Sequence, residues 1–575
     1  MMRRALWSLT LAAVALTACR QPSTTTDARL SGTYAGGWRF SDLREPVTGS
    51  SVMVSSNSAL ASAAGAEIMR NGGNAVDAAV AVGFALAVTY PFAGNIGGGG
   101  FMTIRMADGR TAALDYREVA PLAATRDMYV DSAGKLTDRR LTGHLASGVP
   151  GAVAGMSAAL ERYGTKSLAE VMAPAIRLAR DGFAVDSALF LSLRGAQQRL
   201  CQFAGCTTFY PNGAPPAPGS TLRQPELARS LQLIAEQGPK AFYDGPVGET
   251  LVEEMRQGGG IITREDLRRY EPKWREPILT TYRGHTLITM PPASSGGITM
   301  SETFNILENF APLPPFGSPE YVHLLAEAFR RSFMDRNAKL ADPDFVPVPR
   351  EQLVSKAYAA ELASQISRRR ASKTPAFDAG REPEHTTHYS VVDADGNAVA
   401  TTTTINGGYG SAVWVRGGGF FMNNEMDDFA TQPGTANMFG LVQGEANAIQ
   451  PGKRMLSAMS PTIVLDPKGD VLLVVGAAGG PTIITATTQV ILNVIEFGMP
   501  LTEAMRAPRM HHQALPDAIR HESQGFSDAT LRRLRRMGHE LTAQGGIANV
   551  NAVMRSGNVW HGVHEPRGSG GAVGY

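Results

Sequence analysis

The sequence predicts a large fold of the mixed α+β class, and three observations support this. The chain has 575 residues, 43% of them hydrophobic, which is ample for a large core. Small apolar residues at helical spacing follow residue 55, whereas Thr-rich and β-branched runs between turns after residue 385 indicate strands. The 62 glycines and 35 prolines favour a loop-rich globular protein over a coiled coil.

The N-terminus has the features of an export signal. Arg3 and Arg4 precede an apolar run over 5–18 that is too short to span a bilayer comfortably. The run ends in Leu-Thr-Ala-Cys at 16–19, which resembles a bacterial lipoprotein signal. We therefore expect a signal peptide at 1–18 and a lipidated Cys19, with a plain secretory signal as the alternative. The expected location is the periplasm or outer cell envelope, with membrane contact only through the lipid.

Net charge and cysteine spacing indicate which binding partners and cross-links to expect. The net charge is +2, which gives no electrostatic reason to expect nucleic-acid binding. Besides Cys19, the chain has Cys201 and Cys206, which an exported protein can pair, although so short a loop stabilises modestly and its geometry can forbid the bond. The chain has no Cys-x-x-Cys motif, so a zinc ribbon is not expected.

The segments before residue 385 are mostly predicted helices. A helix over 55–69 is followed by a second over 75–88 that Asn74 can cap. The Gly-rich run 94–100 leads into a strand at 101–105 and lacks the Lys-Ser/Thr of a phosphate loop, so it indicates tight backbone packing. Amphipathic helices dominate 152–367, with 290–297 between a strand and a helix. The polar, Pro-containing segment 368–384 is expected to be a mobile loop.

A hairpin after this loop is the most informative stretch. A strand begins at Thr386, turns at Asp395-Gly396-Asn397 and returns over 398–406. If the chain is cut before Thr386, that residue gains an α-amino group beside its own hydroxyl. The amine has a pKa of about 7.7–8.0, so it can serve as the base that activates the hydroxyl. The alternative is an ordinary edge hairpin whose threonines merely favour β structure.

The run Thr-Thr-His-Tyr-Ser-Val-Val-Asp at 386–393 resembles the processing site of the gamma-glutamyltransferase (gamma-glutamyltranspeptidase) family. The resemblance is not confined to this run: other segments similar to those of the family occur in the family's order between about Val54 and Tyr575. This resemblance implies an N-terminal-nucleophile hydrolase with a four-layer αββα sandwich. It also implies self-cleavage between His385 and Thr386, which gives a large subunit of 19–385 and a small catalytic subunit of 386–575.

The resemblance also assigns an activity and a set of site residues. Thr386 would attack the γ-amide of glutathione or another γ-glutamyl compound, and water or an amino acid or dipeptide acceptor would capture the ester. No cofactor or metal is implied. The resemblance implies catalytic roles for Thr404, Gly479 and Gly480 beside Thr386. It implies that Arg117 and Ser457 bind the substrate's α-carboxylate, and that its ammonium is bound by Asn406, Glu425 and Asp428.

Two departures from the family leave alternatives open. Ser457 is followed by Ala458 where the family often has a second serine, and Phe439 replaces a tyrosine of some members. A glutaryl-type cephalosporin acylase of the same family is the nearest alternative: Ala458 keeps it open, and Asp428 argues against it because a glutaryl group has no ammonium. A non-catalytic envelope lipoprotein would require Thr386 to be dispensable. The His pairs 385/388 and 511/512 are not expected to bind metal.

Overall fold

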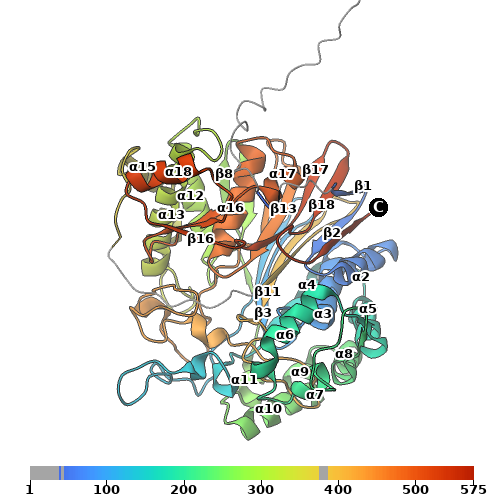
Figure 1. Cartoon of the computed structure of the whole chain (residues 1–575). Helices are drawn as coiled ribbons and strands as arrows, with labels where there is room; N and C mark the ends of the chain where they lie inside the picture. Colours follow the sequence, from blue (N-terminus) through green and yellow to red (C-terminus); the bar gives the residue numbers. More distant parts are fainter. Residues whose placement is uncertain (1–37, 41–44, 375–385) are drawn as a thin grey trace, which may run out of the picture.

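The computed structural model describes residues 38–40, 45–374 and 386–575, so Cys19 and His385 lie outside the described residues. Two seven-stranded antiparallel sheets form its centre (Figure 1). The first, here called the β10 sheet, has the order β19 (Gly571–Gly574), β2 (Met53–Ser56), β10 (Thr387–Val392), β11 (Ala398–Thr404), β3 (Gly99–Arg105), β4 (Thr111–Tyr116), β7 (Lys273–Arg275). The second, the β13 sheet, has the order β1 (Val47–Gly49), β18 (Val559–Val563), β17 (Asn549–Ser556), β13 (Val471–Ala478), β12 (Thr462–Leu465), β9 (His285–Thr289), β8 (Ile278–Tyr282).

Helices cover the outer face of each sheet. The β10 sheet shares a core with α2 (Ala59–Arg70), α3 (Ala75–Thr89), α4 (Ala152–Tyr163), α5 (Leu168–Asp181), α6 (Ser187–Leu200), α8 (Pro225–Gln237) and α10 (Pro246–Gly258). The β13 sheet shares another with α12 (Gly296–Glu308), α13 (Pro319–Lys339), α15 (Lys356–Ser364), α16 (Thr482–Ile495), α17 (Leu501–Arg506) and α18 (Asp528–Arg536). The result is the expected αββα sandwich. No helix in the described ranges is both long and apolar enough to cross a membrane.

Helix α3 shows why the outer layer is anchored firmly. All its 15 residues are buried, because it lies between the β10 sheet and the neighbouring helices α2, α4 and α5. The side chain of Asn74 accepts from the backbone N–H of Asp77, and the Asp77 carboxylate accepts from the N–H of Asn74. This capping box fixes where the helix begins.

Close contact between the two sheets sets the position of β10. Tyr389 and Val391 pack toward the helices, whereas Val392 packs in the core between the sheets. His388 shares the face of Val392 and meets β13 at Gly476, where an added Cβ would lie 2.4 Å from its ring. Side chains alternate along a strand, so Thr386 is directed to this same face, toward the end of β13.

The structure changes three expectations. Residues 53–56 form β2, so the first helix begins at Ala59 and not at residue 55. Strand β10 pairs with β2 and β11 in the middle of its sheet, so the edge-hairpin alternative is wrong. In the expected mobile loop, residues 371–374 are bonded to other elements, as when Arg330 donates to the Thr374 hydroxyl; residues 375–384 lie outside the described part. Cys201 and Cys206 form a disulfide.

Replacing Gly476 with alanine tests the sheet contact. The new methyl group would overlap the buried His388 ring, and overpacking in a core costs about 1–3 kcal/mol. We expect a lower Tm in thermal unfolding followed by circular dichroism. Gly195 is the matched control, because it lies in α6 with no atom within 4 Å of an added Cβ, so alanine there should leave Tm unchanged or raise it. An equal Tm for Gly476→Ala and the unsubstituted protein would contradict the proposed sheet contact.

Candidate active site

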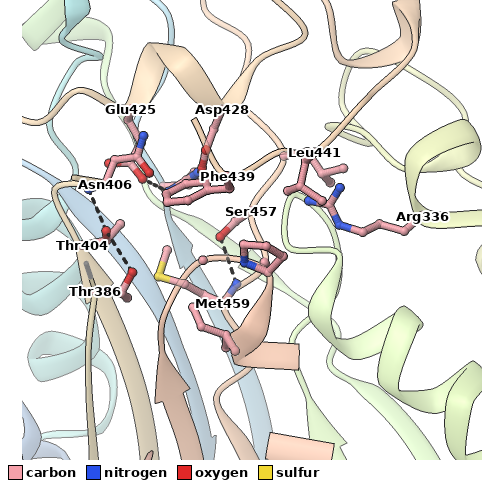
Figure 2. A pocket seen from close by; sticks show the side chains of 16 residues that line it. Arg336, Thr386, Thr404, Asn406, Glu425, Asp428, Phe439, Leu441, Ser457 and Met459 are labelled. Atoms are coloured by element: carbon pink, nitrogen blue, oxygen red, sulfur yellow. Dashed lines mark hydrogen bonds and ion pairs between the residues drawn. The ribbon is translucent and has the colours of Figure 1, made fainter. Parts of the chain in front are cut away.

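A pocket at the end of β10 and β11 gathers most of the residues singled out in the sequence. Its empty space, part of which is open to solvent, is about 320 Å³. Figure 2 shows its lining, with Thr386 and Thr404 on one side and Arg336 on the other. The lining residues are Arg117, Arg336, Thr386, Thr404, Asn406, Glu425, Asp428, Phe439, Leu441, Leu456, Ser457, Ala458, Met459, Gly480, Pro481 and Ile483.

The Thr386 hydroxyl lies at the wall of this pocket, beside the last residue of β11. Thr386 is buried, and its Oγ1 lies 3.5 Å from Oγ1 of Thr404. The backbone N–H of Asn406 donates to that Thr404 oxygen at 2.7 Å, which fixes the Thr404 side chain. Asn406 has a positive φ of 70°, and its amide donates to the carbonyl of Asn424. The turn after β11 therefore holds a hydroxyl against Thr386 and brings Asn406 into the same pocket.

Two glycines connect β13 to α16 next to Thr386. Gly479 and Gly480 have φ values of +134° and +53°, a region that L side chains rarely adopt. A Cβ on Gly480 would also meet the Phe439 ring at 2.9 Å. Gly480 lines the pocket and Gly479 adjoins it, and α16 begins two residues later. The positive end of this helix and the two backbone N–H groups give this corner a preference for negative charge.

A buried guanidinium, that of Arg117, also lines the pocket. Arg117 follows β4 and donates to both Glu425 and Asp428 of the 3₁₀ turn Glu425–Asp428. It also donates through Nε to the carbonyl of Met455. The family resemblance assigns Arg117 to a carboxylate and the two acids to an ammonium, and in the structure these groups pair with one another.

A third carboxylate, Glu118, crowds the same guanidinium. Its Oε2 lies 3.6 Å from Nη1 of Arg117, and neither Glu118 oxygen has a hydrogen-bond partner among the described residues. Burial raises the pKa of Glu118 to about 7, although Arg117 opposes the shift. Burial also raises the pKa of Glu425 well above its usual range. One guanidinium cannot neutralise three buried carboxylates, so this cluster retains protons near neutral pH.

Ser457, Ala458 and Phe439 complete the lining. The Ser457 hydroxyl accepts from the backbone N–H of Met459 at 3.1 Å. Ala458 presents only a methyl group beside it. Phe439 packs against Gly480 from the loop after the 3₁₀ turn.

The sequence analysis missed Arg336. This arginine lies near the end of α13, is 1% exposed and lines the pocket opposite Thr386 (Figure 2). Three arginines occur in α13, and periodicity does not show which one reaches a pocket built mainly from the other half of the chain. Only the packing of α13 against the Ser457 segment reveals it.

A group of three possible metal ligands lies elsewhere, on α13 and near α18. His323, Glu327 and His539 have ligand atoms within 4.8 Å of one another. His323 and His539 hydrogen-bond to each other at 2.8 Å, and Glu327 accepts from Ser372 and Arg331. All three side chains are therefore already engaged in hydrogen bonds within the described residues.

A four-layer αββα sandwich with a threonine hydroxyl at the start of a central strand defines the class of N-terminal-nucleophile hydrolases. Comparisons with known proteins give the family. The family model for gamma-glutamyltranspeptidase matches residues 61–575, and the chain belongs to this family.

Individual relatives agree with this assignment. The chain is 47% identical over 521 residues to a glutathione hydrolase proenzyme of Escherichia coli (strain K12), covering 89% of this chain and 90% of that protein. Among solved structures, cephalosporin acylase from Bacillus halodurans gives a TM-score of 0.83 at 28% identity, covering 94% of this chain and 98% of that one. Helicobacter pylori gamma-glutamyltranspeptidase gives a TM-score of 0.54 at 41% identity, covering 58% of this chain and 94% of that one.

Glu118→Gln tests the charge balance around Arg117. The folded chain raises the pKa of Glu118 from 4.5 to about 7, so this group's contribution to stability is complete below pH 4.5 and is lost as pH rises through 7. Glutamine stays neutral at every pH. As pH rises from 4.5 to 7.5, the free energy of unfolding of the variant should therefore come to exceed that of the unsubstituted protein by up to about 3 kcal/mol. Urea unfolding at a series of pH values measures this difference, and parallel pH profiles would show that Glu118 is already ionised.

Proposed function

We propose that the chain is a self-processing gamma-glutamyltransferase with glutathione hydrolase activity. The observation that carries the proposal is a single pocket with the Thr386 hydroxyl at one side and the cluster of Arg117, Glu425 and Asp428 at the other. A γ-glutamyl compound has its reactive amide at one end and a zwitterion at the other, which matches this arrangement. The family membership and the E. coli relative support the same activity.

The first reaction is cleavage of the chain itself. The Thr386 oxygen attacks the carbonyl carbon of His385 and the peptide nitrogen leaves, which gives an ester and a free α-amine on Thr386. Water then hydrolyses the ester and restores the hydroxyl. The products are a large subunit of 19–385 and a small subunit of 386–575, which stay together because β10 pairs with β2 and β11 pairs with β3 in one sheet.

The second reaction uses the new amine as a base. It accepts the hydroxyl proton while Oγ1 of Thr386 attacks the γ-carbonyl of the donor. The N–H groups of Gly479 and Gly480, at the positive end of α16, stabilise the oxyanion, and Thr404 orients the hydroxyl. The departing amine, cysteinylglycine in glutathione, takes the proton. Water or the amine of an amino acid or dipeptide then releases the γ-glutamyl group.

The binding half of the pocket holds the zwitterion. The substrate ammonium interacts with Asn406, Glu425 and Asp428. The substrate carboxylate interacts with Arg117 and Ser457. Because the acidic cluster holds more carboxylates than Arg117 can neutralise, an incoming ammonium replaces bound protons.

We further propose that the protein is exported. Residues 1–18 are the signal peptide and Cys19 carries the lipid that tethers the chain to the envelope. The Cys201–Cys206 disulfide supports an oxidising compartment. Mass spectrometry of the N-terminal peptide from membranes tests the lipid directly.

A cephalosporin acylase activity is the second candidate, favoured by the Bacillus halodurans structure and by Ala458. A glutaryl group has the carboxylate but lacks the ammonium, so it leaves Asp428 and Glu425 without a substrate partner. We therefore expect γ-glutamyl donors to be preferred over glutaryl donors.

Thr386→Ala tests both reactions at once. Removing the hydroxyl leaves no nucleophile for cleavage, so electrophoresis should show one full-length chain where the unsubstituted protein gives two fragments. Release of nitroaniline from a γ-glutamyl p-nitroanilide, with and without a dipeptide acceptor, should fall to background. Thr387→Ala is the control, because its hydroxyl donates to Asn57, away from the pocket lining. A cleaved or active Thr386→Ala protein would refute the proposed nucleophile.

Ala458→Ser tests the missing hydroxyl. A hydrogen bond to a charged group is worth about 1.5–3 kcal/mol, so the added hydroxyl should lower KM for the γ-glutamyl anilide by about tenfold or more while kcat changes little. Ala458→Val, which enlarges the side chain without a hydroxyl, is the control and should raise KM. If serine and valine shift KM in the same direction, the effect is steric and the hydroxyl plays no part.

A further inference from the structure

Arg336 is a buried cation that no carboxylate of the described chain pairs with. It is 1% exposed, and its Nε and Nη1 donate to the Ser295 hydroxyl at 2.9 Å and to the Asn337 side chain at 2.9 Å. Its Nη2 donates to none of the described residues, and the side chain lines the pocket. Burial lowers the pKa of Arg336 to about 10, although the more distant Asp428 opposes the shift. A guanidinium buried in this way is costly unless an anion reaches it.

The surroundings of Arg336 differ from those of the other arginine in the pocket. Arg117 is already engaged by Glu425 and Asp428, so a ligand carboxylate has to compete with two protein carboxylates for it. Among the described residues, Arg336 donates hydrogen bonds to a hydroxyl and an amide oxygen and forms no ion pair. An incoming carboxylate therefore does not have to displace a directly paired carboxylate of the described chain at Arg336.

A short chain of hydrogen bonds holds Arg336 beside Ser457. Ser295 accepts from Nε of Arg336 and donates through its hydroxyl to the Ser457 carbonyl at 2.6 Å. The Ser295 N–H donates to the same carbonyl at 2.8 Å. In Figure 2, Ser457 lies between Thr386 and the guanidinium of Arg336, which extends toward the centre of the pocket. Arg336 is therefore tied through Ser295 to the backbone of Ser457, and the side chains of both residues line the same pocket.

We propose that Arg336 binds the donor's α-carboxylate directly, together with Ser457, and shares this task with Arg117. The inference rests on the proposed function, because it names a further residue for the same substrate. In this arrangement the ammonium of the zwitterion binds the acidic cluster around Arg117. The carboxylate of the zwitterion binds Arg336. It also explains how the pocket holds a carboxylate although residue 458 is alanine.

Three anilides that differ only at the head group test this assignment. The γ-glutamyl anilide has both charges, the glutaryl anilide lacks the ammonium, and the 4-aminobutyryl anilide lacks the carboxylate. We expect Arg336→Met to raise KM for the first two by about 10- to 100-fold, the loss typical of a charge-assisted contact, and to change KM for the third by less than about threefold. Arg336→Lys keeps the charge but loses the forked donor, so it should recover part of the affinity.

Ser295→Ala separates contact from positioning. This variant removes the hydrogen bonds of the Ser295 hydroxyl to Arg336 and Ser457 but retains the guanidinium. If the role of Arg336 is mainly structural, Arg336→Met and Ser295→Ala should impair turnover of all three anilides equally. That result, or no change in KM for any donor with Arg336→Met, would overturn the proposal. Self-cleavage into two fragments serves as the folding control for each variant.

Failure of the proposed function would give a different result. If the unsubstituted protein turns over none of the anilides, the activity is wrong, and calorimetric titration then tests Arg336 without turnover. L-glutamate should bind the unsubstituted protein more tightly than 4-aminobutyrate does, and Arg336→Met should abolish that difference. An unchanged difference would refute the role of Arg336 in either case.

Discussion

The contact between β10 and β13 is the constraint on which the site depends. His388 packs against Gly476 where the two sheets approach closely, and this contact fixes the face and depth of β10. The residue at the start of that strand is thereby held near the glycines at the end of β13. A side chain at Gly476 would push the sheets apart and separate the hydroxyl of Thr386 from the corner formed by Gly479 and Gly480.

Electrostatics divide the pocket into two regions with different demands. Near Thr386 the lining is made of hydroxyls, backbone N–H groups and the start of α16, all suited to a negative oxygen that forms during reaction. At the far side, charged groups are buried in unequal numbers. The acids outnumber Arg117 in their cluster, while Arg336 lacks a carboxylate partner in the described chain. A zwitterion supplies one charge of each sign and relieves both imbalances.

The sheet topology explains how the chain would remain one molecule after the proposed cleavage. The proposed small subunit contributes β10, β11 and β19 to one sheet, and the large subunit contributes β2, β3, β4 and β7 to the same sheet. Strand β10 pairs with β2 along four residues, so backbone hydrogen bonds cross between the two parts. A side-chain contact also crosses between the two parts, because Arg330 donates to Asp517 as well as to the Thr374 hydroxyl.

Local periodicity and turn residues were enough to predict the mixed fold class and the hairpin at 386–406, because they are properties of neighbouring positions. Most of the pocket residues were predicted through the family resemblance, which rests on motifs in a fixed order. Only the tertiary structure placed that hairpin at the centre of its sheet, paired Arg117 with the acids expected to face it, and brought Arg336 of α13 to Ser457. These relations join residues more than a hundred positions apart. They arise from how two sheets and their helices pack, and a local pattern contains no record of that packing.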